Sequence, residues 1–215
     1  MPYKLEMKDK VLFQMNDDEY LTIEKQQQAE IKVKGSKFIA TAAPVNNESE
    51  AKAFVLQVSK KYFDATHNCY AYTVGIHPAI ISRYNDAGEP AGTAGKPILN
   101  VIQGKGLANV AVVVTRYFGG TKLGVGGLIR AYTDCTRTVI DHCAIVKKYI
   151  FQKLNLRFDY ELTGVVMRTI SQFDAKIIDT KYEKQTQLAL FLRKSKVDDF
   201  QMFLLENTSG KVSIV

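Results

Sequence analysis

The sequence predicts an α+β protein made of two parts. An unbroken apolar run, Val110–Val114, is typical of a strand that is covered on both faces. A single helical face follows it, with apolar residues at steps of four, three, four and four: Leu128, Tyr132, Cys135, Val139 and Cys143. Beyond these, the patterns follow the order strand, helix, strand, strand, helix, strand, which is that of a ferredoxin-like split βαβ unit. We therefore predict a first domain over residues 1–147 and a second over 148–215.

The first domain begins with an extension and a predicted hairpin. Residues 1–19 lack clear periodicity, so we predict a loosely held N-terminal segment there. From 29 to 33 apolar and charged residues alternate, which is typical of a strand with one covered face. Gly35 and Ser36 offer a tight turn, and residues 37–43 form the returning strand.

A helix, two strands and a second helix follow the hairpin. Apolar residues from Ala51 to Val58 lie on one helical stripe, with Asn47 or Ser49 as the predicted N-cap. Two strands are predicted over 67–74 and 79–84. A loop then leads into a short apolar helix, and the valine run begins beyond that helix.

The second domain contains shorter elements whose apolar residues alternate or recur at helical spacing. The predicted elements are a strand over 154–158, a helix over 162–173, a hairpin of 177–184 and 186–193, a helix over 197–204 and a strand over 212–214.

The composition limits the classes of protein to consider. Hydrophobic residues at 46% and charged residues at 24% are ordinary for a packed globular protein. The formal net charge of +7 at pH 7 fits a polyanionic partner, but neither domain has a block of like charge, so a solvated basic surface explains it equally well. Three cysteines, a polar N-terminus and no bilayer-long apolar run predict a cytoplasmic protein with no membrane partner.

Two glycine-rich segments are candidates for an anion-binding site. Thr93 is the predicted N-cap of the short helix, and the long helix begins near Gly124. The start of each helix presents unpaired N–H donors and about half a positive charge. If both face one hollow beside Arg116 and Lys122, they would hold a phosphate or an RNA backbone. The candidate anion- or nucleic-acid-binding residues are Gly92, Thr93, Gly95, Lys96, Arg116, Tyr117, Gly119, Gly120, Lys122, Gly124, Gly126, Gly127 and Arg130.

The glycines also fit a purely structural role in tight turns and close packing. Their spacing does not match a P-loop, because Val125 follows Gly124 where a lysine is required, and Ile129 stands where a dinucleotide fingerprint needs its third glycine. We therefore exclude nucleotide hydrolysis of the P-loop type. The neighbouring aromatic residues Tyr84, Tyr117 and Phe118 would either stack on bases or cover the open edge of the sheet.

Asp86 and Glu89 lie in the first glycine-rich segment and have several interpretations. They would hold Arg116 or Arg130 in place, cap a turn, or bind a hard cation such as Mg²⁺. Equally, Asp86 would be a simple turn residue and Glu89 a surface group. His67 is a further supporting or metal-binding candidate. Mg²⁺ is the only cofactor that these residues suggest, and no sequence feature supplies a nucleophile beside them.

The histidines and cysteines form a nominal zinc set: His67, Cys69, Cys135 and His142. Their spacing lacks the paired CxxC or HxxxH that typifies such sites. Because Cys135 already lies on the apolar stripe of the long helix, core packing is the favoured interpretation of the cysteines.

The segments Asn85–Pro97 and Thr115–Tyr132 carry a resemblance to a known family. They match the two signatures of the YigZ/IMPACT family, and the resemblance covers nearly the whole chain, including the small C-terminal domain of the bacterial members. It implies a first domain similar in fold to the second domain of small-subunit ribosomal protein five, and a C-terminal domain similar to a late domain of the translocation factor EF-G. His67 matches a family position near the signature loops. The control of an initiation-factor kinase, associated with an additional domain of eukaryotic members, is not carried over to this chain.

The resemblance, the positive charge and the two helix starts together predict a non-catalytic protein that binds RNA or the ribosome and takes part in translation regulation. Two alternatives stay open. One is an enzyme that acts on a small phosphorylated or acylated substrate in the same cleft. The other is a protein-binding adaptor that presents the sheet of its ferredoxin-like domain. No residue is assigned a catalytic role.

Overall fold

The computed structural model describes residues 18–76 and 79–214, and the chain forms two compact units. The larger unit is Tyr20–Lys148, and the smaller one contains Asp18 and Glu19 together with the chain from Tyr149 onward. The sequence places the boundary after residue 147, whereas the units divide between 148 and 149. Each unit has helices packed on a sheet, so the predicted α+β class is confirmed.

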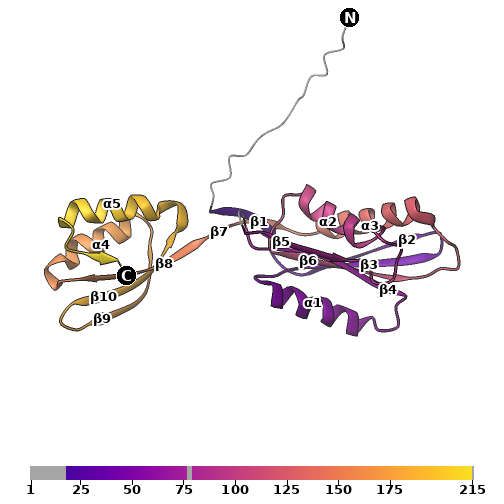
Figure 1. The fold of residues 1–215 in the computed structure, drawn as a ribbon, viewed down its shortest axis with the longest axis horizontal. Helices are drawn as coiled ribbons and strands as arrows, with labels where there is room; N and C mark the ends of the chain where they lie inside the picture. The colour runs from indigo at the N-terminus through magenta and orange to yellow at the C-terminus, as the bar shows by residue number, and fades with distance from the viewer. Residues whose placement is uncertain (1–17, 77–78, 215) are drawn as a thin grey trace, which may run out of the picture. The chain divides into compact units, whose positions relative to one another are not determined.

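The larger unit is built on a five-stranded antiparallel sheet of order β2-β3-β6-β4-β5 (Figure 1). Its strands are β2 (Gln27–Val33), β3 (Ser36–Pro44), β6 (Val110–Tyr117), β4 (His67–Val74) and β5 (Ile81–Asn85). The predicted hairpin is the β2–β3 pair, in which Val33 lies opposite Ser36. The strand predicted over 79–84 begins two residues later, at Ile81.

Helices cover both faces of this sheet. In Figure 1, α1 (Glu48–Lys61) lies on one face, and α2 (Gly95–Gly104) and α3 (Gly124–Asp141) lie on the other. Side chains of β6 alternate between the two cores: Val110, Val112 and Val114 pack with α2 and α3, and Ala111 and Val113 pack with α1. All five are fully buried, which confirms the prediction of a strand covered on both faces.

Local sequence determines how α1 begins and which face of α3 is buried. The Asn47 side-chain oxygen accepts a hydrogen bond from the Glu50 N–H at 2.8 Å, so the predicted N-cap of α1 is confirmed. The helical face predicted to extend to Cys143 is shorter than expected, because α3 ends at Asp141 and Cys143 lies half-buried beyond it. The predicted stripe of α3 contributes four buried residues to the core: Leu128, Tyr132, Cys135 and Val139.

The structure also contains a separate two-stranded sheet that the sequence analysis does not predict. It pairs β1 (Glu19–Ile23) with β7 (Ile145–Tyr149). The Ala108 N–H donates to the Leu21 carbonyl oxygen at 2.9 Å, which attaches β1 to the end of α2. This pairing joins segments more than 100 residues apart, so no local pattern indicates it.

The smaller unit has a four-stranded sheet of order β11-β8-β10-β9. Its elements are β8 (Phe151–Phe158), η1 (Tyr160–Leu162), α4 (Thr163–Gln172), β9 (Lys176–Tyr182), β10 (Thr186–Arg193), η2 (Lys194–Lys196), α5 (Val197–Thr208) and β11 (Ser213–Ile214). Strand β10 lies antiparallel between β8 and β9, which is the predicted split βαβ arrangement. Both helices pack on one face, and no described element of this unit covers the other.

The sequence predicts a loosely held segment over residues 1–19, and this is wrong for Asp18, which is firmly held. Residues 1–17 of the segment lie outside the described residues. The Asp18 carboxylate is fully buried and accepts hydrogen bonds from Arg193 Nε and Nη2, both at 2.9 Å, and from the Ser195 hydroxyl at 2.6 Å. The guanidinium of Arg193 lies 4.1 Å from the ring centroid of Tyr149. These bonds, with that of Arg193 first, hold the pKa of Asp18 well below its ordinary value.

Across residues 18–76 and 79–214, the helices lack the combination of length and apolarity that a membrane crossing requires.

Candidate functional site

The start of α3 opens onto a hollow in the larger unit, with a volume of about 470 Å³. We call this space the α3 hollow. It is lined by the start of β4, the loop before α2, the end of β6 and the start of α3, so residues from both glycine-rich segments meet in it. Its volume is within the range of small-ligand sites. The residues of its lining that bear on binding are His67, Glu89, Arg116, Phe118, Lys122 and Gly124.

A buried ion pair forms part of the wall of the α3 hollow. Arg116 Nη1 donates to Glu89 Oε1 at 2.6 Å, and both side chains are almost completely buried. Of the alternatives open for Glu89, support of Arg116 is the one that the structure shows, and the interpretation of Glu89 as a surface group is wrong because its side chain is buried. Burying either charge alone would be strongly unfavourable, so each side chain depends on the other.

Arg116 retains one donor without a partner. Its Nε is buried and makes no hydrogen bond to any residue that the structure describes. The guanidinium lies 5.5 Å from the ring centroid of Phe38 and 5.6 Å from that of Phe118. The aromatic rings stabilise the cation without neutralising it.

Tyr132 and Cys69 extend this network into the core. The Tyr132 hydroxyl donates to Glu89 Oε1 at 2.8 Å, and the Cys69 thiol donates to the Asp86 carbonyl oxygen at 2.9 Å. Burial raises the pKa of Cys69 to about 12, so the thiol is protonated at neutral pH and is not a nucleophile. Burial also raises the pKa of Tyr132, which therefore keeps its proton. The sequence prediction places Tyr132 only in the core, although a buried tyrosine hydroxyl usually has a hydrogen-bond partner.

His67 lies beside the ion pair. Its Nδ1 is 2.9 Å from the Ala87 carbonyl oxygen, and its Nε2 is 4.0 Å from Glu89 Oε2. The first contact fixes the orientation of the ring, and the second places the other nitrogen at the wall of the hollow.

Asp86 occupies the donors that were expected to face an external anion. Its Oδ1 accepts from the Ala94 and Gly95 N–H groups at 3.0 and 2.8 Å, and its Oδ2 accepts from the Gly92 N–H at 2.9 Å. The expectation that the start of α2 presents open amides is therefore wrong. A carboxylate of the same loop takes the place that a phosphate would take.

Three further residues of that segment have structural roles or lie elsewhere. Thr93 is not the N-cap: Ala94 is, and the Thr93 hydroxyl donates to the Pro90 carbonyl oxygen at 2.6 Å. A Cβ on Gly95 would lie 2.8 Å from the backbone of Asn85, so glycine is needed there for close packing. Lys96 is exposed and is not part of the lining of the α3 hollow.

Among the residues that the structure describes, no side chain caps the start of α3 in this way. Its N-cap, Leu123, makes no side-chain cap hydrogen bond, and the first turn contains no acidic residue. Gly124 has a φ of 73°, a conformation that favours glycine, and it lines the hollow next to the exposed Lys122. This terminus therefore directs a partial positive charge toward the space beside Lys122.

The remaining candidate residues do not line the α3 hollow. A Cβ on Gly119 would lie 1.9 Å from the backbone of Gly35, so this glycine serves close packing. The Tyr117 hydroxyl donates to Asp64 at 2.8 Å, away from the hollow. The other predicted residues outside the lining are Gly92, Gly120, Gly126, Gly127 and Arg130.

The metal-binding interpretations receive no support from the geometry. Among residues 18–76 and 79–214, no group of three or more His, Cys, Asp or Glu side chains is placed to hold a metal ion. Cys69 and Cys135 are buried and free, and His142 follows the last turn of α3. His77 lies outside the described residues.

Fold and site together define a class of protein. It is a two-unit α+β protein with a ferredoxin-like second unit, and in its first unit the start of α3, Arg116 and Lys122 border a hollow. Two family models match the chain: the Impact N-terminal domain over residues 34–140, and a domain of unknown function, DUF1949, over residues 156–211.

The chain belongs to the IMPACT family. It is 33% identical to the IMPACT family member YvyE of Bacillus subtilis, over 91% of this chain and 89% of that protein. It is 34% identical to the IMPACT family member YigZ of Escherichia coli, over 85% of this chain and 90% of that protein. The crystal structure of a hypothetical protein, 31% identical, superposes with a TM-score of 0.69 over 92% of this chain and 97% of its own. The predicted family is confirmed.

Proposed function

We propose that this protein is a non-catalytic, translation-associated regulatory protein of the cytoplasm that contacts RNA through the α3 hollow. Membership of the IMPACT family supports a role related to translation. The observation that carries the RNA contact is the uncapped start of α3, which opens beside Lys122 and Arg116.

The charges around the α3 hollow favour an anion. Arg116 and Glu89 neutralise each other, and Tyr132 adds a further donor to Glu89. The uncompensated positive charge therefore comes from Lys122 and from the first amides of α3. Lys122 is exposed and makes no ion pair with any described residue, so a phosphate can approach it without breaking an existing contact.

Phe118 favours a nucleic acid over a free anion. Its side chain is 48% exposed although it lines the hollow, and its ring already packs beside the Arg116 guanidinium. An exposed ring next to a cationic site offers a base a surface to stack on, a contact worth about 1–3 kcal/mol per base. Stacking needs a base that is free of its own neighbours, so single-stranded RNA is the expected ligand.

The test is a fluorescence anisotropy titration of a labelled, single-stranded oligouridylate with the full chain at several salt concentrations. The logarithm of the association constant should fall linearly with the logarithm of salt concentration. The Lys122→Ala variant should bind about fivefold more weakly, and its salt slope should be smaller by about 0.7, the value for one phosphate contact on a single strand.

The matched control is Lys60→Ala, which removes the same charge from the exposed end of α1. It should leave both affinity and slope unchanged. Absence of RNA binding at low salt would contradict the proposal. So would equal losses in the two lysine variants.

One observation favours the second candidate, an enzyme for a small phosphorylated or acylated substrate. His67 Nε2 lies 4.0 Å from the Glu89 carboxylate, at the wall of a hollow of ligand size. Native mass spectrometry of the purified chain would show a retained metabolite of that class. Loss of the metabolite in His67→Ala, with RNA binding unchanged, would favour the enzyme.

A further inference from the structure

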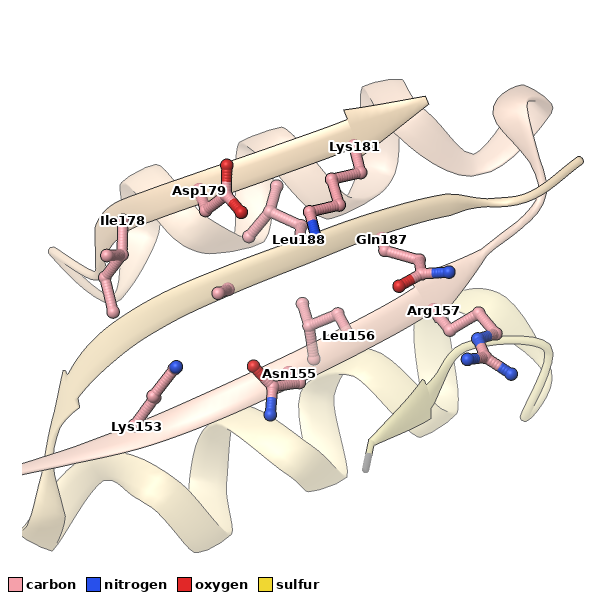
Figure 2. A pocket seen from close by; sticks show the side chains of 10 residues that line it. Lys153, Asn155, Leu156, Arg157, Ile178, Asp179, Lys181, Gln187 and Leu188 are labelled. Carbon is pink, nitrogen blue, oxygen red and sulfur yellow. The ribbon is translucent and has the colours of Figure 1, made fainter. Parts of the chain in front are cut away.

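The uncovered face of the smaller unit's sheet carries cations that its core does not require. Along β8, Leu154, Leu156 and Phe158 are buried, whereas Lys153 and Arg157 are exposed on the opposite side. Figure 2 shows these two cations on β8 and Lys181 on β9, with the helices behind the sheet. They border a shallow depression of about 340 Å³ whose lining also includes Asn155, Asp179, Gln187 and Ala189. We call the side of this sheet that faces away from α4 and α5, with this depression and the neighbouring Lys176 and Phe191, the open sheet face.

The register aligns these residues in rows across three strands. Gln187 of β10 lies opposite Arg157 on one side and Lys181 on the other. Further along β10, Phe191 lies opposite Lys153 on one side and Lys176 on the other. These two rows each have a cation on β8 and on β9 and an uncharged side chain on β10, whereas the row between them, Asn155–Ala189–Asp179, carries one carboxylate. The two rows are four residues apart along β10, which corresponds to about 13 Å.

These cations are not compensated within the unit. Lys153, Arg157, Lys176 and Lys181 make no ion pair with any residue in the part of the chain that the structure describes. Asp179 is the acidic residue of the lining, and its carboxylate accepts from the Thr180 N–H at 2.9 Å. Because these four cations make no ion pair with a described residue, ion pairing does not explain their presence on this face.

Phe191 is the second unusual feature of this face. It lies on the middle strand between two lysines, and 40% of it is exposed to solvent. The alternating residues Leu190 and Leu192 are buried on the helix side, so Phe191 contributes no core packing there. An aromatic ring between cations fits a stacked base whose flanking phosphates meet those cations.

We propose that the open sheet face binds single-stranded RNA, with phosphates on Lys153, Arg157, Lys176 and Lys181 and a base stacked on Phe191. This inference rests on the proposed function and deepens it: the protein holds RNA at a second surface, on its other unit. A duplex does not fit this mode, because its bases are already stacked on one another.

The experiment uses the full chain and a labelled single-stranded oligouridylate, followed by fluorescence anisotropy across salt. The double variant Arg157→Ala with Lys181→Ala should bind about tenfold more weakly, with a salt slope smaller by about 1.4, the value for two phosphate contacts. The matched control is Arg168→Ala with Lys211→Ala, an equal change of charge at exposed positions outside the lining of the open sheet face. The control should bind within about twofold of the unmodified chain.

Substitutions at Phe191 test the stacking contact separately from the phosphate contacts, because they leave the net charge unchanged. Phe191→Ala should weaken binding roughly tenfold without changing the salt slope, whereas Phe191→Tyr, which keeps an aromatic ring, should bind like the unmodified chain. Circular dichroism melts of all variants check that the fold is retained.

Four results would overturn the inference: a sheet-face double variant that binds like its control, equal binding of the Ala and Tyr variants at 191, duplex RNA bound as tightly as the single strand, or polyglutamate competing as well as RNA. The last result would assign the face to an acidic protein. Weak binding by Lys122→Ala with normal binding by the sheet-face variant would remove this inference and leave the α3 hollow. The reverse result would keep the open sheet face and remove the α3 hollow.

Discussion

The two helices on one face of the larger sheet both begin in glycine-rich segments, but their first amides have different partners. At the start of α2, the Asp86 carboxylate accepts three backbone hydrogen bonds from inside the same loop. At the start of α3, the N-cap Leu123 provides no side-chain acceptor, and no acidic residue lies in the first turn. One terminus is completed by the protein itself, whereas no side chain in the described part of the chain caps the other, and we propose that a ligand binds there.

This difference shows that glycines around a helix start do not by themselves indicate an anion site. What matters is whether a carboxylate of the same chain already occupies the position of the anion. The start of α2 therefore serves stability, and we propose that the start of α3 serves binding; the following variants test that difference.

The largest expected effect concerns the ion pair beside both termini. Arg116→Met leaves the buried Glu89 carboxylate without its cation and should lower the free energy of unfolding by about 3–5 kcal/mol, measured by urea denaturation. The double variant with Glu89→Leu should recover part of this loss, because no buried charge is then left unpaired. A single-variant loss below about 1 kcal/mol would show that the pair is not structural.

The next effect concerns the internal cap of α2. Asp86→Ala removes the acceptor of three backbone N–H groups and should lower the free energy of unfolding by about 2–3 kcal/mol. Asp134→Ala, at an exposed position on α3, is the control and should change it by less than about 0.5 kcal/mol. Similar results for the two variants would refute the capping role.

Asp18 is a buried carboxylate of the smaller unit, and its contribution to the free energy of unfolding can be tested by varying pH. Its pKa is held below the ordinary value, mainly by Arg193, so the unfolded chain takes up the proton at a higher pH than the folded chain. The stabilisation is therefore present above about pH 4 and is lost as pH falls below it. Asp18→Asn should cost about 1–3 kcal/mol near pH 7, and the difference from the unmodified chain should shrink in urea titrations near pH 3. An equal difference at both pH values would exclude this linkage.

The smallest expected effect on stability belongs to α3's start. Lys122→Ala should change the free energy of unfolding by less than about 0.5 kcal/mol, because the side chain is exposed and makes no ion pair with a described residue. Its RNA affinity should nevertheless fall, as proposed above. A stability loss like that of Asp86→Ala would mean that the two termini do not differ as described.

Much of the fold follows from local patterns. The valine run of β6, the buried stripe of α3 and the Asn47 cap of α1 each depend on neighbouring residues, and the structure confirms all three. The pairing of β1 with β7 has no such local signal, because each strand needs a partner from the other end of the larger unit.

The site was harder to predict, for a physical reason. The sequence shows which residue types lie near a helix start, but the acceptor that each amide receives depends on how the loop closes. Asp86 lies six to nine residues before the amides that it caps, which is not a local capping spacing, so the sequence leaves turn capping, support of an arginine and metal binding open as alternatives for it. Tyr132 and Phe38 lie at core positions, and their apolar spacing in the sequence does not indicate that Tyr132 bonds to Glu89 or that the Phe38 ring packs beside the Arg116 guanidinium.

The most direct test of the central claim is backbone amide NMR of the larger unit's two helix starts within the full chain, during titration with oligouridylate. The account predicts shift changes at Gly124, Val125 and Gly126 that saturate with RNA, and unchanged shifts at Gly92, Ala94 and Gly95, whose amides are held by Asp86. Shift changes confined to the α2 amides, or none at α3, would contradict it.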